Sequence, residues 1–270
     1  MPLAICATPI GNLDDVTLRV LEELRAADLV LCEDTRRTRI LLTRHGIDAR
    51  LESHHRHNEA ARTPRVLERL RGGARVALVA DAGLPGVNDP GARLIAAAVA
   101  AGFEVAVLPG ASAVETALVA SGLAADRYQF VGYLPRRVGE LRALAVGLGG
   151  WGGAVVAFES PRRLPASLRV LAEVLPGRRA AVCRELTKRF EEVVRGSLEV
   201  LAVQFAEAPR GEITLVLGPS EVGRGVGEDD VAARTAVAEL VEAGASRRTA
   251  AEVVSRLTGA SRNALYRGSL

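Results

Sequence analysis

The sequence predicts an α/β protein in which two α/β domains enclose a ligand cleft, followed by a small helical tail. Apolar segments of strand length alternate with segments of helical periodicity over most of the chain, as in sheets covered by helices. Three predicted strands lead into loops that open helices, at residues 9–12, 81–89 and 109–112. In a parallel sheet such loops gather along one edge, where ligands bind. The chain therefore predicts a site built from loops that are far apart in the sequence.

The first domain is expected over residues 1–122. Its predicted strands occupy residues 3–7, 28–32, 50–53, 75–80 and 104–108. Asn12 is expected to cap the helix after the first strand, and Asp89 the helix after the fourth strand. Ser112 and Glu115 have the spacing of a capping box at the start of the next helix.

The second domain is expected over residues 123–218. Its predicted strands occupy residues 128–134, 154–158, 180–186 and 213–217. Residues 219–228 are rich in glycine and are predicted to form a linker. Residues 229–270 are predicted to form the helical tail.

The composition is that of a globular protein with 270 residues, of which 49% are hydrophobic and 25% charged. No apolar run reaches the ~18 residues of a membrane span and no signal peptide opens the chain, so we expect a cytoplasmic protein. The three cysteines lie far apart, which argues against disulfides and zinc. Three of the four histidines lie in residues 54–57. Because no second cluster joins them, we expect no metal there but a polar loop that faces the substrate.

Arginines often occur in adjacent pairs, although the net charge is only +3. Three of the pairs lie next to predicted cleft loops: Arg36 and Arg37, Arg136 and Arg137, and Arg162 and Arg163. Aromatic residues make up 3% of the chain, too few for a base-stacking platform. Any nucleic acid is therefore expected to be bound through its phosphates.

The loop at residues 79–91, VADAGLPGVNDPG, points to a cationic ligand. It carries Asp81 and Asp89 and no basic residue, and it lacks the GxGxxG and GK[ST] patterns of phosphate-binding loops. S-adenosylmethionine (SAM), which has a sulfonium, an amine and a ribose, fits these groups better than ATP or NAD. A plain turn between a strand and a helix is the alternative.

Lys188 is the single lysine among 35 lysines and arginines. Lysine differs from arginine in being a compact donor that loses its proton when it is desolvated. The sequence therefore makes Lys188 a candidate general base, or a candidate for a group that orients one. The alternative is that a lysine stands at this position by chance.

Nine stretches, in order along nearly the whole chain, resemble the ribosomal small-subunit RNA methyltransferase I family of the tetrapyrrole methylase superfamily. They are ATPIGNLDDVTLR (7–19), EDTRRTRILL (33–42), HNE (57–59), DAGLPGVNDPG (81–91), PGASA (109–113), GYLPRR (132–137), FESPRR (158–163), RELTKRFEE (184–192) and GEITLVL (211–217). SRNALYR (261–267) resembles the small C-terminal helical domain of that family. The chain departs from the family at Leu84, Asn88 and Arg163, where threonine, serine and histidine are common.

The resemblance implies a class III SAM methyltransferase with the tetrapyrrole methylase fold and the cofactor folded between two α/β domains. It implies methylation of the ribose 2′-oxygen of a cytidine (cytidine 1402) in the decoding centre of 16S rRNA, with the 30S subunit as partner and a homodimeric enzyme. Cofactor contacts are expected at Pro9, Asp81, Ala82, Gly83, Leu84, Pro85, Ser112, Ala113, Phe158, Glu159, Leu186, Ile213 and Thr214. As acceptor of the hydroxyl proton we consider Lys188 first, and then Glu192, Asp89 and Glu59 without ranking them.

Two other functions remain open. A small-molecule methyltransferase of the same superfamily, acting on a tetrapyrrole, would want a large apolar cleft and would not need the arginine pairs. A non-enzymatic RNA-binding protein that keeps the fold would fail to bind SAM. The tail suggests a second RNA contact or a dimer contact through its arginines, which are Arg247, Arg248, Arg256, Arg262 and Arg267.

Overall fold

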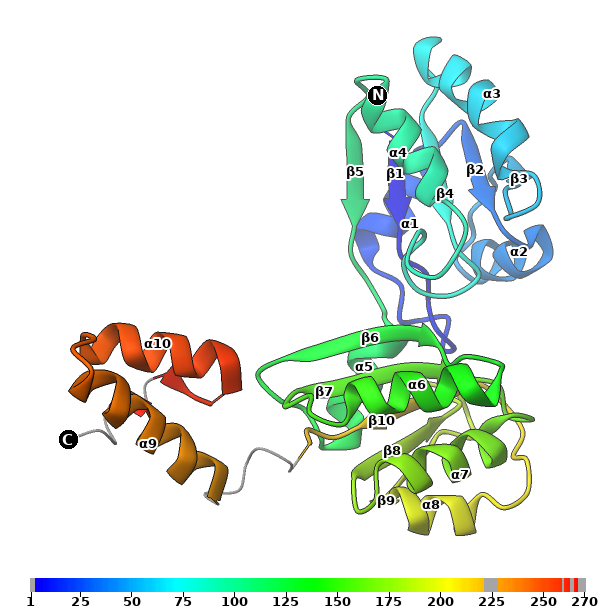
Figure 1. Cartoon of the computed structure of the whole chain (residues 1–270). Helices are drawn as coiled ribbons and strands as arrows, with labels where there is room; N and C mark the ends of the chain where they lie inside the picture. The colour runs from blue at the N-terminus through cyan, green and yellow to red at the C-terminus, as the bar shows by residue number, and fades with distance from the viewer. Residues whose placement is uncertain (1–2, 221–227, 259, 263–264, 267–270) are drawn as a thin grey trace.

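The computed structural model describes residues 3–220, 228–258, 260–262 and 265–266. Its first sheet is parallel and has the strand order β3-β2-β4-β1-β5 (Figure 1). The strands are β1 (Leu3–Cys6), β2 (Leu29–Cys32), β3 (Leu51–Ser53), β4 (Val76–Val79) and β5 (Val105–Leu108). Helices α1 (Leu18–Ala26) and α2 (Thr35–Arg44) pack on one face, and α3 (Glu59–Arg71) and α4 (Ala92–Ala100) on the other. Because both faces are covered, β1, β2 and β4 are buried over their whole length.

The second sheet is mixed and has the strand order β6-β7-β10-β8-β9. Its strands are β6 (Tyr128–Tyr133), β7 (Ala154–Glu159), β8 (Arg179–Arg184), β9 (Glu192–Ser197) and β10 (Ile213–Leu217). Only β6 and β7 are parallel, and β10 runs antiparallel to both of its neighbours. One face packs against α6 (Val138–Leu148), α7 (Leu164–Val174) and α8 (Leu198–Gln204). The predicted α/β class with two sheets is confirmed.

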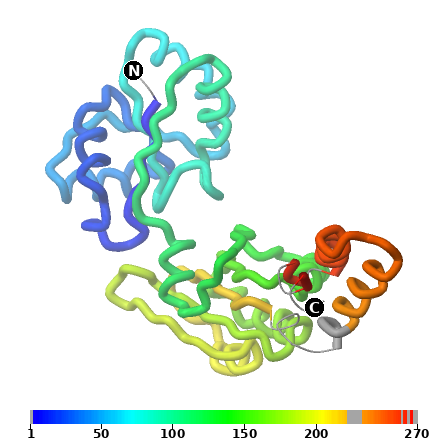
Figure 2. Tube along the Cα trace, turned by 90° about the vertical axis from the view of Figure 1, so that its left-hand side faces the viewer, coloured from blue at the N-terminus to red at the C-terminus, as the bar shows by residue number. Residues whose placement is uncertain are grey.

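Helix α5 (Ala113–Ser121) covers the other face of the second sheet. Its side chains Val114, Ala117 and Leu118 share an apolar cluster with residues of β7, β8 and β10. Figure 2 shows the chain leaving β5 and crossing to α5 beside the second sheet. We therefore propose that the first domain ends near residue 110 and not at residue 122, because a helix belongs to the sheet against which its apolar side packs.

The strand β9 and the helix α8 do not follow from the sequence prediction. Strand β9 is an edge strand whose residues are only partly buried, so it lacks the apolar run that identifies β8. Together β8 and β9 form a hairpin whose turn, residues 185–191, lies within the RELTKRFEE stretch. The unpredicted hairpin is what brings this stretch to the cleft.

Two of the expected helix caps are wrong. Helix α1 begins after Thr17, whose side chain accepts a hydrogen bond from the Val20 amide, while Asn12 accepts one from the Asp14 amide in the preceding turn. Helix α4 begins after Gly91 and not after Asp89. The first prediction is wrong because the Asn12 side chain caps a local turn instead of a helix. The second is wrong because the side chain that caps α4 comes from another helix, as described below.

The tail contains α9 (Glu228–Glu242) and α10 (Arg247–Thr258), which pack on each other around a small apolar cluster of their own (Figure 1). The predicted linker is described at residues 219, 220 and 228, and residue 228 already belongs to α9. Ser220 donates through its hydroxyl to the Gly149 carbonyl at 2.6 Å. Residues 221–227 and Arg267 lie outside the described residues. No helix in the described part of the chain is long and apolar enough to cross a membrane.

Candidate active site

A cavity of about 650 Å³ lies between the two sheets. One side, which we call the backbone wall, consists of the loops after β4 and β5, residues 82–84, 87–89 and 109–113. The other side, which we call the aromatic wall, consists of Tyr128, Phe130, Tyr133 and Phe158 on β6 and β7. The rest of the lining comes from residues 211–214, just before and at the start of β10, and from Ile10, Val114, Glu115, residues 159–161, Cys183 and Leu186.

The backbone wall is fixed by main-chain contacts between strand ends. Thr8, just after β1, exchanges two backbone hydrogen bonds with Gly83 and donates through its hydroxyl to the Ala80 carbonyl at 3.0 Å. Gly83 has φ +76°, which a side chain would strain. A Cβ on Gly110 would lie 2.9 Å from the Ala7 Cβ. The two loops therefore approach the cavity closely and present mainly backbone groups to it.

The aromatic wall is built around Phe158. Its ring meets Phe130 edge-on at 4.9 Å and Tyr133 at 5.5 Å between ring centroids. Behind it, the side chain of Glu159 is fully buried and accepts hydrogen bonds from the Ser160 amide (2.6 Å) and the Ser167 hydroxyl (2.5 Å). Arg163 also donates to this carboxylate at 3.0 Å. The buried charge is thus paired, as a carboxylate in a sheet interior requires.

No lysine, arginine or histidine is among the described residues that line this cavity. Four of its lining residues are acidic, namely Asp89, Glu115, Glu159 and Glu212. The Glu115 carboxylate accepts from the Tyr128 hydroxyl at 2.6 Å and from the Ser112 hydroxyl. The Ser112–Glu115 pattern is therefore a contact between side chains, because the Ser112 side chain makes no cap hydrogen bond to the backbone. Acids and aromatic faces together favour a cationic ligand.

Asp89 is the acid whose environment is most unusual. Burial, followed by the neighbouring carboxylates of Glu33 and Asp81, raises its pKa to about 6. Asn88 before it has φ +65°, a left-handed conformation that asparagine adopts more readily than most residues. The loop therefore presents a carboxylate to the cavity that changes its protonation state near neutral pH.

A smaller cavity of about 260 Å³ adjoins the larger one and shares Ile10, Ala82 and Glu212 with it. Lys188 lines it from the β8–β9 turn, with its ammonium 3.0 Å from the Glu185 carboxylate and 2.8 Å from that of Glu212. Burial alone lowers the pKa of Lys188, but the hydrogen bonds to the two carboxylates outweigh it and the pKa is raised. Lys188 is therefore held as an ammonium, in contrast to the easily deprotonated lysine that the sequence suggested.

Most of the residues expected to contact the cofactor lie around these cavities. The larger cavity is lined by Ala82, Gly83, Leu84, Ser112, Ala113, Phe158, Glu159, Leu186, Ile213 and Thr214. Pro9 and Asp81 line the smaller cavity, and the buried Pro85 is in the lining of neither. Sequence reasoning missed Tyr128 and Phe130, and it used the GYLPRR stretch only for its arginines although Tyr133 lies within it.

Of the four candidate bases, Asp89 and Lys188 line the cavities, while Glu192 and Glu59 do not. Glu192 pairs with Arg184 across the β8–β9 ladder at 2.9 Å. The Glu59 carboxylate accepts from the amides of Gly91 (3.0 Å) and Arg93 (3.1 Å). It therefore caps helix α4 from a different helix, in the place that the sequence assigned to Asp89.

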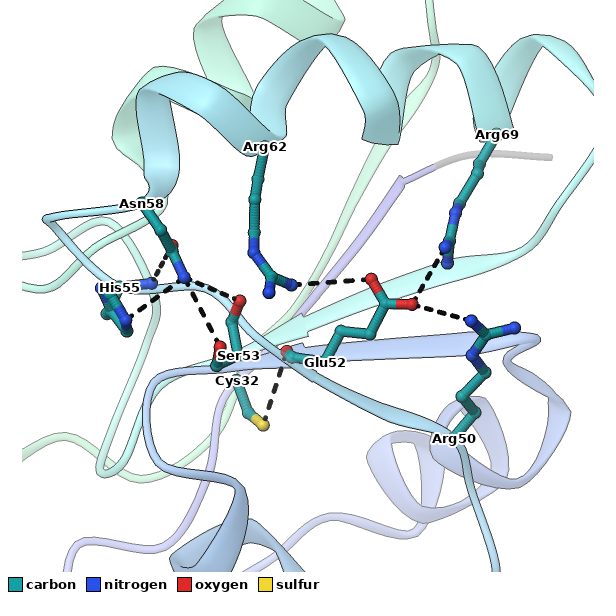
Figure 3. A network of polar contacts seen from close by, with 8 residues as sticks. All are labelled: Cys32, Arg50, Glu52, Ser53, His55, Asn58, Arg62 and Arg69. Carbon is teal, nitrogen blue, oxygen red and sulfur yellow. Dashed lines mark hydrogen bonds and ion pairs between the residues drawn. The ribbon is translucent and has the colours of Figure 1, made fainter.

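No residue of the histidine-containing loop, residues 54–57, is in the lining of either cavity, and the loop's contact with the substrate stays a prediction. His54 is fully buried behind Glu59, and burial lowers its pKa. Asn58 closes the turn by accepting from the His55 amide at 2.8 Å and donating to the Ser53 carbonyl at 3.1 Å (Figure 3). The same figure shows Arg50, Arg62 and Arg69 around Glu52. In the described part of the chain, no cluster of three or more metal-binding side chains is found. The HNE stretch thus positions Glu59.

The arginine pairs separate into exposed and internal residues. Arg36, Arg136, Arg137 and Arg162 are exposed. Arg37 is 62% exposed and lies 3.5 Å from Asp81 at the smaller cavity. Arg163 instead donates to the Leu134 carbonyl (2.6 Å) and to Glu159 in the interior. Its guanidinium therefore makes its hydrogen bonds within the protein, beside the aromatic wall, and does not face a partner.

Comparisons with known proteins agree with this architecture. The family model of tetrapyrrole (corrin/porphyrin) methylases matches residues 2–202. A solved structure of uroporphyrin-III C-methyltransferase from Thermus thermophilus, complexed with S-adenosylhomocysteine, shares the fold with a TM-score of 0.56 and 19% identity. That match covers 83% of this chain and 99% of the other.

Curated relatives are more similar in sequence. The ribosomal RNA small subunit methyltransferase I of Mesorhizobium japonicum is 45% identical, over 98% of this chain and 90% of its own length. The protein of the same name from Synechocystis is 38% identical, over 99% of this chain and 97% of its own. These identities extend through both sheets and into the tail, and they show that this chain belongs to the ribosomal RNA small subunit methyltransferase I family of tetrapyrrole methylases.

Proposed function

We propose that this protein is a SAM-dependent methyltransferase that modifies the ribose 2′-oxygen of a cytidine in 16S rRNA, with cytidine 1402 as the expected target. The observation that carries the proposal is the larger cavity, which has acidic and aromatic lining residues and no basic residue. The names of the curated relatives support rRNA as the substrate. The S-adenosylhomocysteine in the related structure supports the cofactor.

The residues present fit SAM. The aromatic faces of the wall suit a sulfonium, and carboxylates suit the cationic amine. Backbone groups at Gly83 and Ala111, with Ile213 and Thr214 opposite, would hold the uncharged parts. When bound there, SAM supplies an electrophilic methyl group attached to a cationic sulfur.

Asp89 is our choice for the group that accepts the hydroxyl proton. Its carboxylate lines the cavity and its pKa of about 6 leaves it ionised at neutral pH yet basic enough to take a proton. Lys188, already protonated between Glu185 and Glu212, would instead hold these two carboxylates in place. Positioning the hydroxyl in line with the methyl group supplies much of the remaining acceleration.

The exposed arginines outside the cavities are proposed to bind rRNA phosphates. They are Arg36, Arg136, Arg137 and Arg162, and affinity for RNA should then fall steeply with salt. Arg37 is left out of this set because it faces Asp81 at the smaller cavity. The 30S subunit as substrate and a homodimeric enzyme belong to the same proposal. Light scattering and a comparison of 30S subunits with naked rRNA test these two points.

The decisive test is methyl transfer from labelled SAM to unmodified 30S subunits, with naked 16S rRNA and a tetrapyrrole in parallel. We expect the label in 30S RNA, recovered as 2′-O-methylcytidine by nucleoside analysis. Label in the tetrapyrrole alone would overturn the rRNA assignment and leave the fold intact. Failure to bind SAM would favour a non-enzymatic RNA-binding protein.

A further inference from the structure

The smaller cavity lies where the methyl acceptor must approach. It adjoins the proposed cofactor cavity directly, because Ile10, Ala82 and Glu212 line both. Its remaining walls come from the loop after β1, from α2, from Ala80 and Asp81 after β4, and from the β8–β9 turn. A group bound in the smaller cavity therefore lies beside the cofactor without displacing it.

The charges around the smaller cavity do not suit a phosphate. The cations Arg37 and Lys188 are both neutralised, Arg37 by Asp81 at 3.5 Å and Lys188 by Glu185 and Glu212 at 3.0 and 2.8 Å. An anion would meet three carboxylates and two cations that already have partners. A neutral ligand with several donors and acceptors avoids this repulsion.

The remaining surface suits a flat or ring-shaped neutral group. Pro9, Leu13, Ile40 and Leu41 supply an apolar surface, and Thr8 and Thr38 supply hydroxyl-bearing side chains. At about 260 Å³ the cavity is smaller than the ~300 Å³ at which sites for drug-sized ligands begin, so it has room for one nucleoside and not for a helix.

We propose that the smaller cavity receives the target nucleoside after it has been extruded from the RNA. This inference rests on the proposed function, which requires a 2′-hydroxyl beside the methyl donor. Enzymes that modify one nucleotide of a folded nucleic acid commonly take it out of the stack into such a pocket. The carboxylates of Asp81 and Glu212 match the exocyclic amine of cytosine, because Asp and Glu are the usual acceptors for that amine. Uracil presents an oxygen at the same position and would be repelled.

Ile40 offers a way to block the cavity without disturbing the core. Its side chain lines the cavity on α2 yet is 60% exposed, so Ile40→Trp adds bulk at the entrance. Leu18→Trp on α1 is the matched control, because Leu18 is 78% exposed and lines neither cavity. Exposed substitutions of this kind change stability little. Both proteins are to be compared with wild type for SAM affinity by calorimetry and for kcat/KM on 30S subunits.

We expect Ile40→Trp to lower kcat/KM for 30S subunits at least tenfold while the Kd for SAM changes less than twofold. Leu18→Trp should match wild type in both. Equal kcat/KM for the two variants would overturn the cavity assignment while leaving the proposed function standing. A tenfold loss of SAM affinity in Ile40→Trp would also overturn it, because the cavity would then belong to the cofactor. Absence of RNA methylation by wild type would overturn the proposed function and this inference together.

Discussion

The two walls of the larger cavity are made in different ways. The backbone wall comes from the parallel first sheet, and its contacts are hydrogen bonds between loops, such as the pair between Thr8 and Gly83. The aromatic wall comes from the mixed second sheet, where rings pack on Phe158 in front of the buried Glu159. The first wall should therefore respond to changes in backbone geometry and the second to changes in side chains.

Asp89 is an exception within this comparison. It belongs to the backbone wall, but its proposed role depends on its side chain. Tyr133 on the opposite wall has its pKa raised by burial first and then by Glu212, Asp89 and Glu159. Because Asp89 acts on Tyr133 through its charge, Asp89, the proposed proton acceptor, lies near the place where the two walls meet.

The largest effect is expected for Arg163→Met on the aromatic wall. This variant leaves the fully buried Glu159 without its cation, although Ser160 and Ser167 still donate to it. We expect a loss of about 3 kcal/mol in the free energy of unfolding, measured by urea denaturation. Arg162→Met is the control, because Arg162 is exposed, and it should change stability by less than about 0.5 kcal/mol. Equal stability of the two variants would show that the aromatic wall does not depend on this ion pair.

Asp89→Asn is expected to have the next largest effect, on turnover. A positioned base contributes about 10²–10⁴-fold, so we expect kcat to fall about 100-fold while SAM still binds. The pH dependence of kcat tests the same role of Asp89. Asp89 accepts a proton only when ionised, so wild-type kcat should fall as the pH decreases through about 6, and the variant should lack this step. A variant that retains the step would assign the titration to another group.

The backbone wall was largely predictable from the sequence, whereas the aromatic wall was not. Loops that follow parallel strands meet at one edge of the sheet, so the positions of Ala82, Gly83 and Ser112 followed from the order of strands and helices. In the second sheet, strands run in both directions, and the sequence pattern does not specify which ends meet. The side chains of Tyr128 and Phe130 face the cavity because of strand pairing, which no local signal reveals.

The roles of Glu59 and Lys188 show the same limit at single residues. Both were noticed in the sequence, Glu59 in HNE and Lys188 as the sole lysine. What the sequence could not supply was the neighbour of each side chain. Glu59 meets the amides of α4, and Lys188 meets two carboxylates, one of them from the start of β10. Each role depends on a contact that is distant in the sequence: Lys188 and Glu212 are 24 positions apart, and Glu59 and Gly91 are 32 positions apart.

Gly110→Ala tests the backbone wall directly. The added Cβ would lie 2.9 Å from the Ala7 Cβ, so the loops after β1 and β5 must separate. We expect a loss of about 1–2 kcal/mol in stability, with weakened SAM binding measured by calorimetry. Gly139→Ala in α6 is the control, because its Cβ would meet no atom within 4 Å and alanine favours a helix. Unchanged SAM affinity in Gly110→Ala would mean that the close approach of the two loops is not needed for binding.

The smallest effect is expected for Glu59→Gln. This substitution tests whether the backbone wall depends on the Glu59 side chain, which caps helix α4. The substitution keeps an acceptor for the α4 amides but removes the negative charge at the helix N-terminus, worth about 1 kcal/mol in a partly buried position. Thermal unfolding should show that loss, while kcat stays within about threefold of wild type because Glu59 lines neither cavity. Glu68→Gln, exposed on the same helix, should change neither quantity. A drop of about 100-fold in kcat with normal stability would instead make Glu59 the proton acceptor, since the loss would then lie in chemistry and not in the position of the loop.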